Sequence, residues 1–121
     1  MTIRGIRGAT RVPENSAAAI DRSTQELLRA MVSANNLEID QIVSIFLTAT
    51  VDLDAAYPAA AARAMGWTKI PLLDAQEIDV RGGMPRVVRV LMHVESDYSH
   101  DQIHHIYLGD AVKLRPDLAN P

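Results

Sequence analysis

A charged side chain lies in the middle of the most apolar strand that the sequence predicts. Arg89 is surrounded by valine, leucine and methionine in residues 87–92 (VVRVLM), and Arg7 lies in the alternating run of residues 3–9 (IRGIRGA). A guanidinium stays protonated at any ordinary pH, so burying it without an anionic partner is costly. The pattern predicts either a pocket that receives an anion or an internal salt bridge to an acidic side chain.

The composition is that of one ordinary globular domain. The 121 residues suffice for one domain with a core but not comfortably for two, and a net charge of −3 favours neither nucleic acid nor an anionic membrane as the main partner. The absence of cysteine excludes disulfides, thiolate catalysis and cysteine-based metal sites. The basic residues are nearly all arginine, which favours bidentate recognition of carboxylate or phosphate, although a high genomic G+C content produces the same bias.

We expect a cytoplasmic protein that does not bind membranes. The N-terminus has no continuous apolar segment, and no apolar stretch approaches the roughly 20 residues that span a bilayer.

The hydrophobic pattern predicts alternating strands and helices in a single domain, residues 1–121. Strands are expected at residues 2–10, 41–50, 69–74, 86–96 and 103–108, a long helix at 15–36, and a short alanine-rich helix after Pro58. The order predicts an α/β (α+β) fold with a mixed five-stranded sheet, one long helix and one short helix, followed by an irregular tail at 113–121. So few helices leave apolar strand faces uncovered, so a homo-oligomer is expected.

Within the strand at 41–50, alternation assigns side chains to two faces. Val43, Ile45, Leu47 and Ala49 are predicted to share one face, while Ser44, Phe46 and Thr48 share the other.

Seven short blocks follow one another along nearly the whole chain. They are residues 4–10 (RGIRGAT), 48–53 (TATVDL), 57–59 (YPA), 76–80 (QEIDV), 86–90 (RVVRV), 105–108 (HIYL) and 112–118 (VKLRPDL). In this order they resemble the AroH class of monofunctional chorismate mutases.

The resemblance implies a homotrimer of small α/β subunits that form a pseudo-barrel, with active sites in clefts between neighbouring subunits. It also implies the Claisen rearrangement of chorismate to prephenate, a step of the shikimate pathway of aromatic amino-acid biosynthesis. This unimolecular reaction requires no cofactor and no metal. The sequence accordingly lacks a nucleophile elbow, a phosphate-binding loop and a zinc-protease motif.

The resemblance assigns catalytic roles to three residues. Arg89 is the cation beside the ether oxygen of chorismate, Arg7 binds the side-chain carboxylate with help from the Tyr107 hydroxyl, and Glu77 accepts a hydrogen bond from the ring hydroxyl. The alternative for Arg89 is a purely structural salt bridge to Glu77 or Asp74.

Further residues are assigned to substrate binding. Tyr57 occupies the place of an aromatic side chain that flanks the ring, and Leu72 and Leu73 line the wall beneath it. Arg63 and Arg115 are expected at the mouth of the cleft, with a structural role as the alternative for both.

The chain departs from the family pattern at two positions. Ala60 stands where the family often has a lysine, which predicts weaker substrate binding. Asp74 stands where a small polar residue often contacts the ring hydroxyl. We expect Asp74 and Glu77 to repel each other and one pKa to rise, unless an arginine lies between them.

The histidines do not form a recognisable metal motif. His104 and His105 are adjacent on a predicted strand and so point to opposite faces, and neither they nor His93 has a third ligand at a familiar spacing. We expect no metal site.

Two other functions remain open from the sequence. One is a non-catalytic protein that binds chorismate or prephenate on the same scaffold. The other is a small trimeric enzyme similar to imine deaminases, which also place an arginine in an interface cleft; the pairing of Arg89 with Glu77 argues against it.

Overall fold

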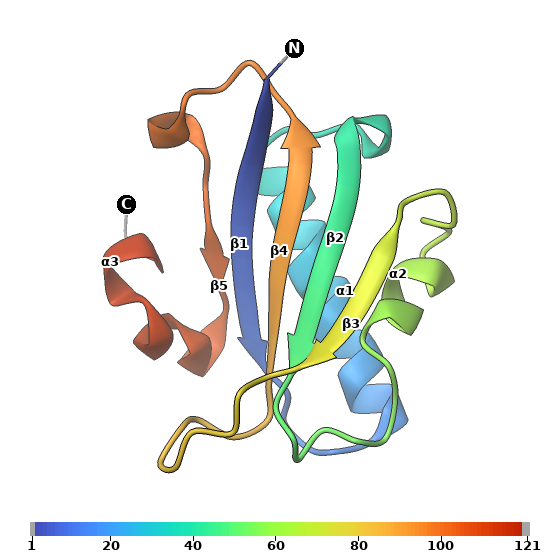
Figure 1. Ribbon diagram of the computed structural model, residues 1–121, viewed down its shortest axis with the longest axis vertical. Helices are drawn as coiled ribbons and strands as arrows, with labels where there is room; N and C mark the ends of the chain where they lie inside the picture. The colour runs from blue at the N-terminus through green and yellow to red at the C-terminus, as the bar shows by residue number, and fades with distance from the viewer. Residues whose placement is uncertain (1, 120–121) are drawn as a thin grey trace.

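A five-stranded mixed sheet and one long helix make up most of the computed structural model, which describes residues 2–119 (Figure 1). The strands are β1 (Ile3–Arg11), β2 (Ile42–Ala49), β3 (Leu72–Gln76), β4 (Val87–Glu95) and β5 (Ile106–Tyr107). The α-helices are α1 (Ala17–Ala34), α2 (Ala59–Ala64) and α3 (Pro116–Ala119), and the 3-10 helices are η1 (Ile39–Gln41), η2 (His100–Gln102) and η3 (Gly109–Leu114). The predicted mixed α/β class is confirmed.

The sheet order is β3-β2-β4-β1-β5. The central strand β4 pairs antiparallel with both β1 and β2, whereas the outer pairs β2–β3 and β1–β5 are parallel. Strand β3 begins immediately after Pro71, and it forms one edge of the sheet, where the missing proline N–H breaks no ladder.

Helix α1 covers one face of this sheet (Figure 1). Its N-cap is Ser16, whose hydroxyl accepts a hydrogen bond from the Ala19 N–H at 3.1 Å. Ile20, Leu27, Leu28 and Met31 repeat at helical spacing and are fully buried against the sheet. The helix predicted from the apolar periodicity of residues 15–36 is therefore present as α1.

Close packing of α1 on β1 depends on a glycine. A Cβ at Gly8 would lie 2.5 Å from the sulfur of Met31 and 3.2 Å from Cδ1 of Leu27, both fully buried side chains. The helix can approach the strand this closely only because position 8 has no side chain.

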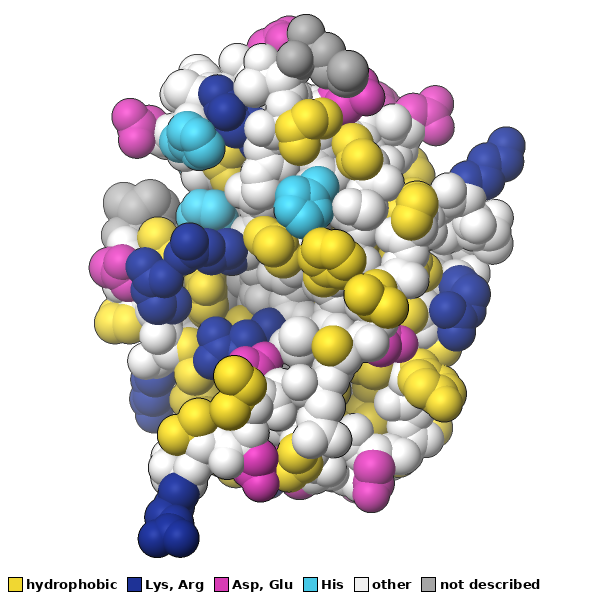
Figure 2. All heavy atoms as spheres, in the orientation of Figure 1, with side chains coloured by type: hydrophobic (Ala, Val, Ile, Leu, Met, Phe, Trp, Pro, Cys, Tyr) yellow, Lys and Arg dark blue, Asp and Glu magenta, His cyan; other side chains and the backbone are white. Residues whose placement is uncertain are grey.

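We call the other face of the sheet the open face. Within residues 2–119 no α-helix lies across it, and only η3 packs on one end, where its Ala111 joins Ala9 and Val87 in a small buried cluster. It presents exposed apolar side chains on four strands: Ile3 (46% exposed), Phe46 (44%), Leu73 (58%) and Leu91 (38%). Figure 2 views this face, where basic side chains lie beside a central hollow and hydrophobic side chains border it. A monomer rarely leaves such a large apolar surface in water.

Three details of the sequence prediction are wrong. Val43 is exposed instead of sharing the buried face of Ile45, because a β-bulge between Ile42 and Ser44 shifts the alternation. Strand β5 has only two residues instead of the predicted six. The tail predicted to be irregular at 113–121 is helical over its described part, in η3 and α3, while residues 120–121 lie outside the described residues.

None of the described helices is long and apolar enough to span a membrane.

Replacing Gly8 with alanine should destabilise the protein by about 1–3 kcal/mol, because the added methyl overpacks the α1–β1 contact. Urea unfolding measures the free-energy change. Gly5→Ala is the matched control on the same strand, since its Cβ would meet only Leu91 Cδ1 at an ordinary 3.5 Å. Equal effects of the two substitutions would contradict this packing argument.

Candidate active site

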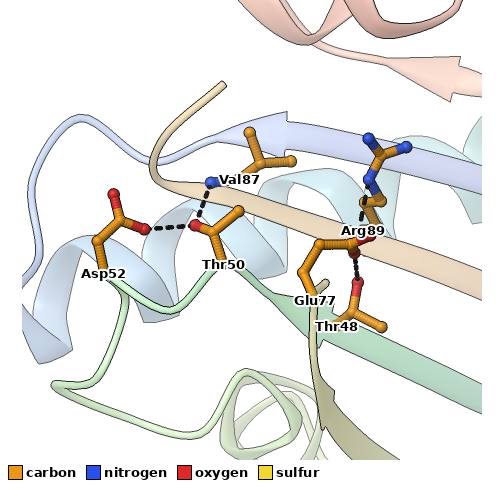
Figure 3. A network of polar contacts seen from close by, with 6 residues as sticks. All are labelled: Thr48, Thr50, Asp52, Glu77, Val87 and Arg89. Atoms are coloured by element: carbon orange, nitrogen blue, oxygen red, sulfur yellow. Dashed lines mark hydrogen bonds and ion pairs between the residues drawn. The ribbon is translucent and has the colours of Figure 1, made fainter. Parts of the chain in front are cut away.

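Arg89 and Glu77 meet on the open face of the sheet (Figure 3). The Nε of Arg89 lies 3.5 Å from Oε2 of Glu77, and the same carboxylate oxygen accepts a hydrogen bond from the Thr48 hydroxyl at 2.5 Å. The side chains are partly exposed, 40% for Arg89 and 27% for Glu77. The salt bridge considered from the sequence is therefore present, and it still leaves the guanidinium partly open to solvent.

The backbone fixes the positions of Arg89, Glu77 and Thr48. Thr48 and Arg89 are directly opposite each other in the β2–β4 ladder. Glu77 follows the last residue of β3, and its N–H donates to the Ala49 carbonyl at 2.9 Å, which extends the parallel β2–β3 pairing by one residue. Thr48 and Arg89 therefore lie on adjacent strands, and Glu77 lies one residue beyond β3, where its backbone bond to β2 positions it.

A polar cluster fixes the beginning of β4, two residues before Arg89. The Thr50 hydroxyl accepts from the Val87 N–H at 3.1 Å and donates to Asp52 (Figure 3). The Asp52 carboxylate also accepts from the Arg86 N–H at 3.0 Å. These contacts hold Arg86 at φ +57°, a backbone conformation that residues other than glycine adopt only at some cost in free energy. These contacts anchor the start of the strand that carries Arg89.

Arg7 and Tyr107 complete this part of the open face. A cavity of about 380 Å³ is lined by side chains of four strands and of the residue after β3, among them Arg7, Thr48, Glu77, Arg89 and Tyr107. An adjoining cavity of about 430 Å³ shares Glu77 and Arg89 and extends between the 78–85 loop and Leu114. We call the residues Arg7, Glu77, Arg89 and Tyr107 the arginine group.

His105, the residue just before the edge strand β5, supports Arg7. Its Nδ1 accepts a hydrogen bond from the backbone N–H of Arg7 at 2.9 Å, where the short β5 leaves the β1 ladder unpaired. Burial, followed by the positive charges of Arg7 and Arg115, lowers the pKa of His105. Both effects favour the neutral imidazole, which is the form that can accept this bond.

A second set of predicted site residues lies at the opposite edge of the sheet. Tyr57 is exposed just before α2, Arg63 is exposed on α2 itself, and Leu73 is exposed on β3. Leu72 and Asp74 alternate with Leu73 and pair with Ile45 and Leu47, so they face the helix-covered side. We call the residues Tyr57, Arg63, Leu72, Leu73 and Asp74 the β3 group. Within one chain, the structure does not bring it into the cavity of the arginine group.

Asp74 caps the short helix α2. Both of its carboxylate oxygens accept from the Ala59 N–H, at 3.1 and 3.3 Å. Burial raises the pKa of Asp74, and the Ala59 N–H and the charge of Arg63 only partly oppose that effect. The sequence prediction of a raised pKa in this pair of acids thus holds for Asp74, but its cause is burial instead of repulsion by Glu77.

Arg115 lies with the arginine group. Its guanidinium forms two hydrogen bonds with Asp117, at 2.9 and 3.1 Å, and its charge helps to lower the pKa of His105. In this structure its side chain is therefore held by the C-terminal helices.

Among residues 2–119, no group of three or more histidine and acidic side chains could hold a metal ion. His104 and His105 have different neighbours, because the His104 N–H donates to Asn35 while His105 contacts Arg7.

Sequence reasoning missed several residues that line the cavities, among them Thr48, Phe46 and Leu114. The alternation of the 41–50 strand already placed Thr48 and Phe46 on one face. What the sequence did not contain was the register that sets Thr48 opposite Arg89.

Comparison with known proteins identifies the family. The model of the family "Chorismate mutase type I" matches residues 3–118, so the chain belongs to the type I chorismate mutases, which are isomerases. The chain is similar to chorismate mutase AroH of Thermus thermophilus, with 45% identity over 96% of each chain. It is also similar to chorismate mutase AroH of Bacillus subtilis, with 43% identity over 98% of this chain and 94% of that one.

A solved structure agrees in fold. The chorismate mutase from Clostridium thermocellum superposes with a TM-score of 0.88 at 50% identity, covering 89% of this chain and 96% of that chain. The family, the enzyme class and the reaction predicted from the sequence are thereby confirmed. The two alternatives, a non-catalytic binding protein and an imine deaminase-like enzyme, gain no support from these relatives.

The lowered pKa of His105 predicts a pH dependence of stability. A histidine whose pKa is lower in the folded state than its unfolded value of 6.5 stabilises the fold above that pH, and this stabilisation is lost as the pH falls through the folded pKa. Between pH 7 and 5, the free energy of unfolding should therefore fall more steeply for the parent than for His105→Asn. Asparagine keeps an acceptor near the position of Nδ1 but does not titrate. Parallel losses, followed by chemical denaturation at each pH, would contradict the assignment.

Proposed function

We propose that the chain converts chorismate to prephenate in a site where the arginine group binds and polarises the substrate. The observation that carries this proposal is the cavity of about 380 Å³ in which Arg7 and Arg89 face one acid, Glu77. Chorismate is a dicarboxylate, so a cavity with two fixed cations matches its charge. Guanidinium groups suit carboxylates because their planar donors can bind both oxygens.

The chemical step needs no nucleophile. The enolpyruvyl side chain of chorismate must fold over the ring before the C–O bond breaks and the C–C bond forms. Arg7 and the Tyr107 hydroxyl bind the side-chain carboxylate and so hold this compact conformer, which removes part of the entropic barrier. The proposed mechanism requires no cofactor and no metal.

Arg89 supplies the electrostatic stabilisation of the transition state in this mechanism. As the C–O bond lengthens, negative charge develops on the ether oxygen, and a fixed cation beside it binds the transition state more tightly than the substrate. Positive charge develops on the ring, where Glu77 accepts the hydrogen bond of the ring hydroxyl. One preorganised donor of this kind contributes roughly 3–4 kcal/mol.

We further propose that three copies assemble so that the β3 group of one subunit faces the arginine group of its neighbour. The separation of the two groups within one chain supports this, as does the exposed apolar surface of the open face. Tyr57 and Leu73 then flank the substrate ring with Leu72 behind them. Asp74 stays on the helix-covered side as the cap of α2, so the contact with the ring hydroxyl that the resemblance assigned to it is not part of this proposal. Arg63 and Arg115 lie at the mouth of the cleft. Prephenate leaves by the same opening.

This cleft has one cation fewer than is usual in the family, because Ala60 stands where the family often has a lysine. The ring carboxylate faces solvent in this arrangement, so the missing charge weakens substrate binding more than it slows the chemical step. We place the reaction in the cytoplasm as part of aromatic amino-acid biosynthesis, in keeping with the bacterial relatives.

Arg89→Ala should lower kcat by at least a few hundredfold, because it removes the donor at the ether oxygen. The loss of chorismate's ultraviolet absorbance, with prephenate identified as the product, measures the rate. Arg29→Ala is the matched control, since Arg29 is an exposed arginine of α1, on the opposite side of the sheet. An Arg89→Ala protein that retains activity within tenfold of the parent would refute the electrostatic role. If the parent bound chorismate or prephenate tightly without converting it, the alternative of a non-catalytic binding protein would be favoured instead.

Phe46→Asp should dissociate the proposed trimer, because it places a charge in the apolar centre of the open face. Sedimentation velocity of the parent should show a trimer and that of the variant a smaller species. Ile39→Asp, at a similarly exposed apolar residue (38% against 44%) outside the strands, should leave the size unchanged. A parent that sediments as a monomer would contradict the assembly.

A further inference from the structure

The contact between Arg89 and Glu77 lacks the geometry that such a pair ordinarily adopts. A guanidinium and a carboxylate that are free to move form two parallel hydrogen bonds of about 2.7–2.9 Å. Here Oε2 of Glu77 is 3.5 Å from Nε of Arg89, and that nitrogen is buried without a hydrogen-bond partner among the described residues. Figure 3 shows the terminal nitrogens of Arg89 pointing away from Glu77.

The Thr48 hydroxyl accounts for this geometry. It donates to Oε2 of Glu77 at 2.5 Å, a much closer contact than that of Arg89 with the same oxygen. Thr48 is fixed by its strand, opposite Arg89 in the ladder, and a β-branched side chain has few rotamers. The Glu77 backbone is also fixed, by its N–H bond to Ala49. Thr48 thus holds the Glu77 carboxylate at a fixed distance from the Arg89 guanidinium.

We propose that Thr48 is a positioning residue, whose hydroxyl keeps Glu77 from closing on Arg89 and so leaves the terminal donors of Arg89 free for the substrate. This inference rests on the proposed function. Without the hydroxyl, Glu77 is free to rotate toward Arg89 and form the bidentate pair. That pair neutralises the cation and occupies the donors that would otherwise meet the ether oxygen and the side-chain carboxylate.

The substitutions Thr48→Val and Thr48→Ser separate the hydroxyl from the shape of the side chain. Valine has nearly the same shape without the hydroxyl, while serine keeps the hydroxyl on a smaller side chain. We expect Thr48→Val to lower kcat by about tenfold or more, as for loss of a hydrogen bond to a charged group, and to change KM less. Thr48→Ser should stay within about threefold of the parent. Equal activity of the valine variant and the parent would overturn the proposal.

A double-mutant cycle tests whether Thr48 acts through Glu77. In a Glu77→Gln background, Thr48→Val should cause little further loss, because the carboxylate that it positions is gone. Full additivity of the two losses would show that Thr48 acts independently of Glu77 and would overturn the positioning role.

Crystal structures of the parent and of Thr48→Val test the inference without reference to activity. The valine variant should show Glu77 in hydrogen-bonding contact with Arg89, with Nε–Oε2 shortened from 3.5 Å to about 2.9 Å. An unchanged carboxylate position would overturn the proposal. If the parent did not convert chorismate, the proposed function would fail, and the crystal structures would still decide whether Thr48 sets the Arg89–Glu77 distance.

Discussion

The packing of α1 against one face of the sheet determines what the other face is available to do. The helix supplies Ile20, Leu27, Leu28 and Met31 to the core, and Gly8 allows it to lie close to β1. Hydrophobic burial on that side supplies the larger of the two cores, while the opposite side has only a small cluster around Ala9, Val87 and Ala111. The central strands can therefore carry charged residues on the open face while their alternate residues remain in the core.

The site uses this arrangement to fix charge on rigid strands. Arg89 and Arg7 belong to β4 and β1, and Glu77 is tied to β2 through its backbone and through Thr48. Side chains held by strands and by neighbouring hydrogen bonds have little freedom to reorganise as charge moves in a reaction. Such preorganisation is the main means by which a protein can accelerate a rearrangement that needs neither a nucleophile nor a cofactor.

The sequence predicted the element order, the mixed sheet and the shared face of Phe46 and Thr48, because each depends on local periodicity. It failed where a long-range contact overrides that periodicity. The bulge at Val43 follows from pairing with β4, and the helices of the C-terminal segment pack beside β1 and β5. The 3.5 Å spacing of Arg89 and Glu77 depends on strand register, which alternation alone does not specify.

In the candidate site, too, the identity of the residues could be predicted from the sequence, but their arrangement in space could not. Family resemblance supplied the residues of both groups, and the structure places the arginine group around one cavity. The proposed position of the β3 group opposite a neighbouring subunit depends on assembly, whose geometry the pattern of one chain does not specify. Asp74 illustrates this, because within the chain its carboxylate serves as the cap of α2.

The most direct test of this account is a crystal structure of the protein with prephenate bound. We predict that the ligand contacts Arg7 and Arg89 of one subunit together with Tyr57 and Leu73 of a neighbouring subunit. Prephenate bound by residues of a single subunit, or away from Arg89, would contradict it.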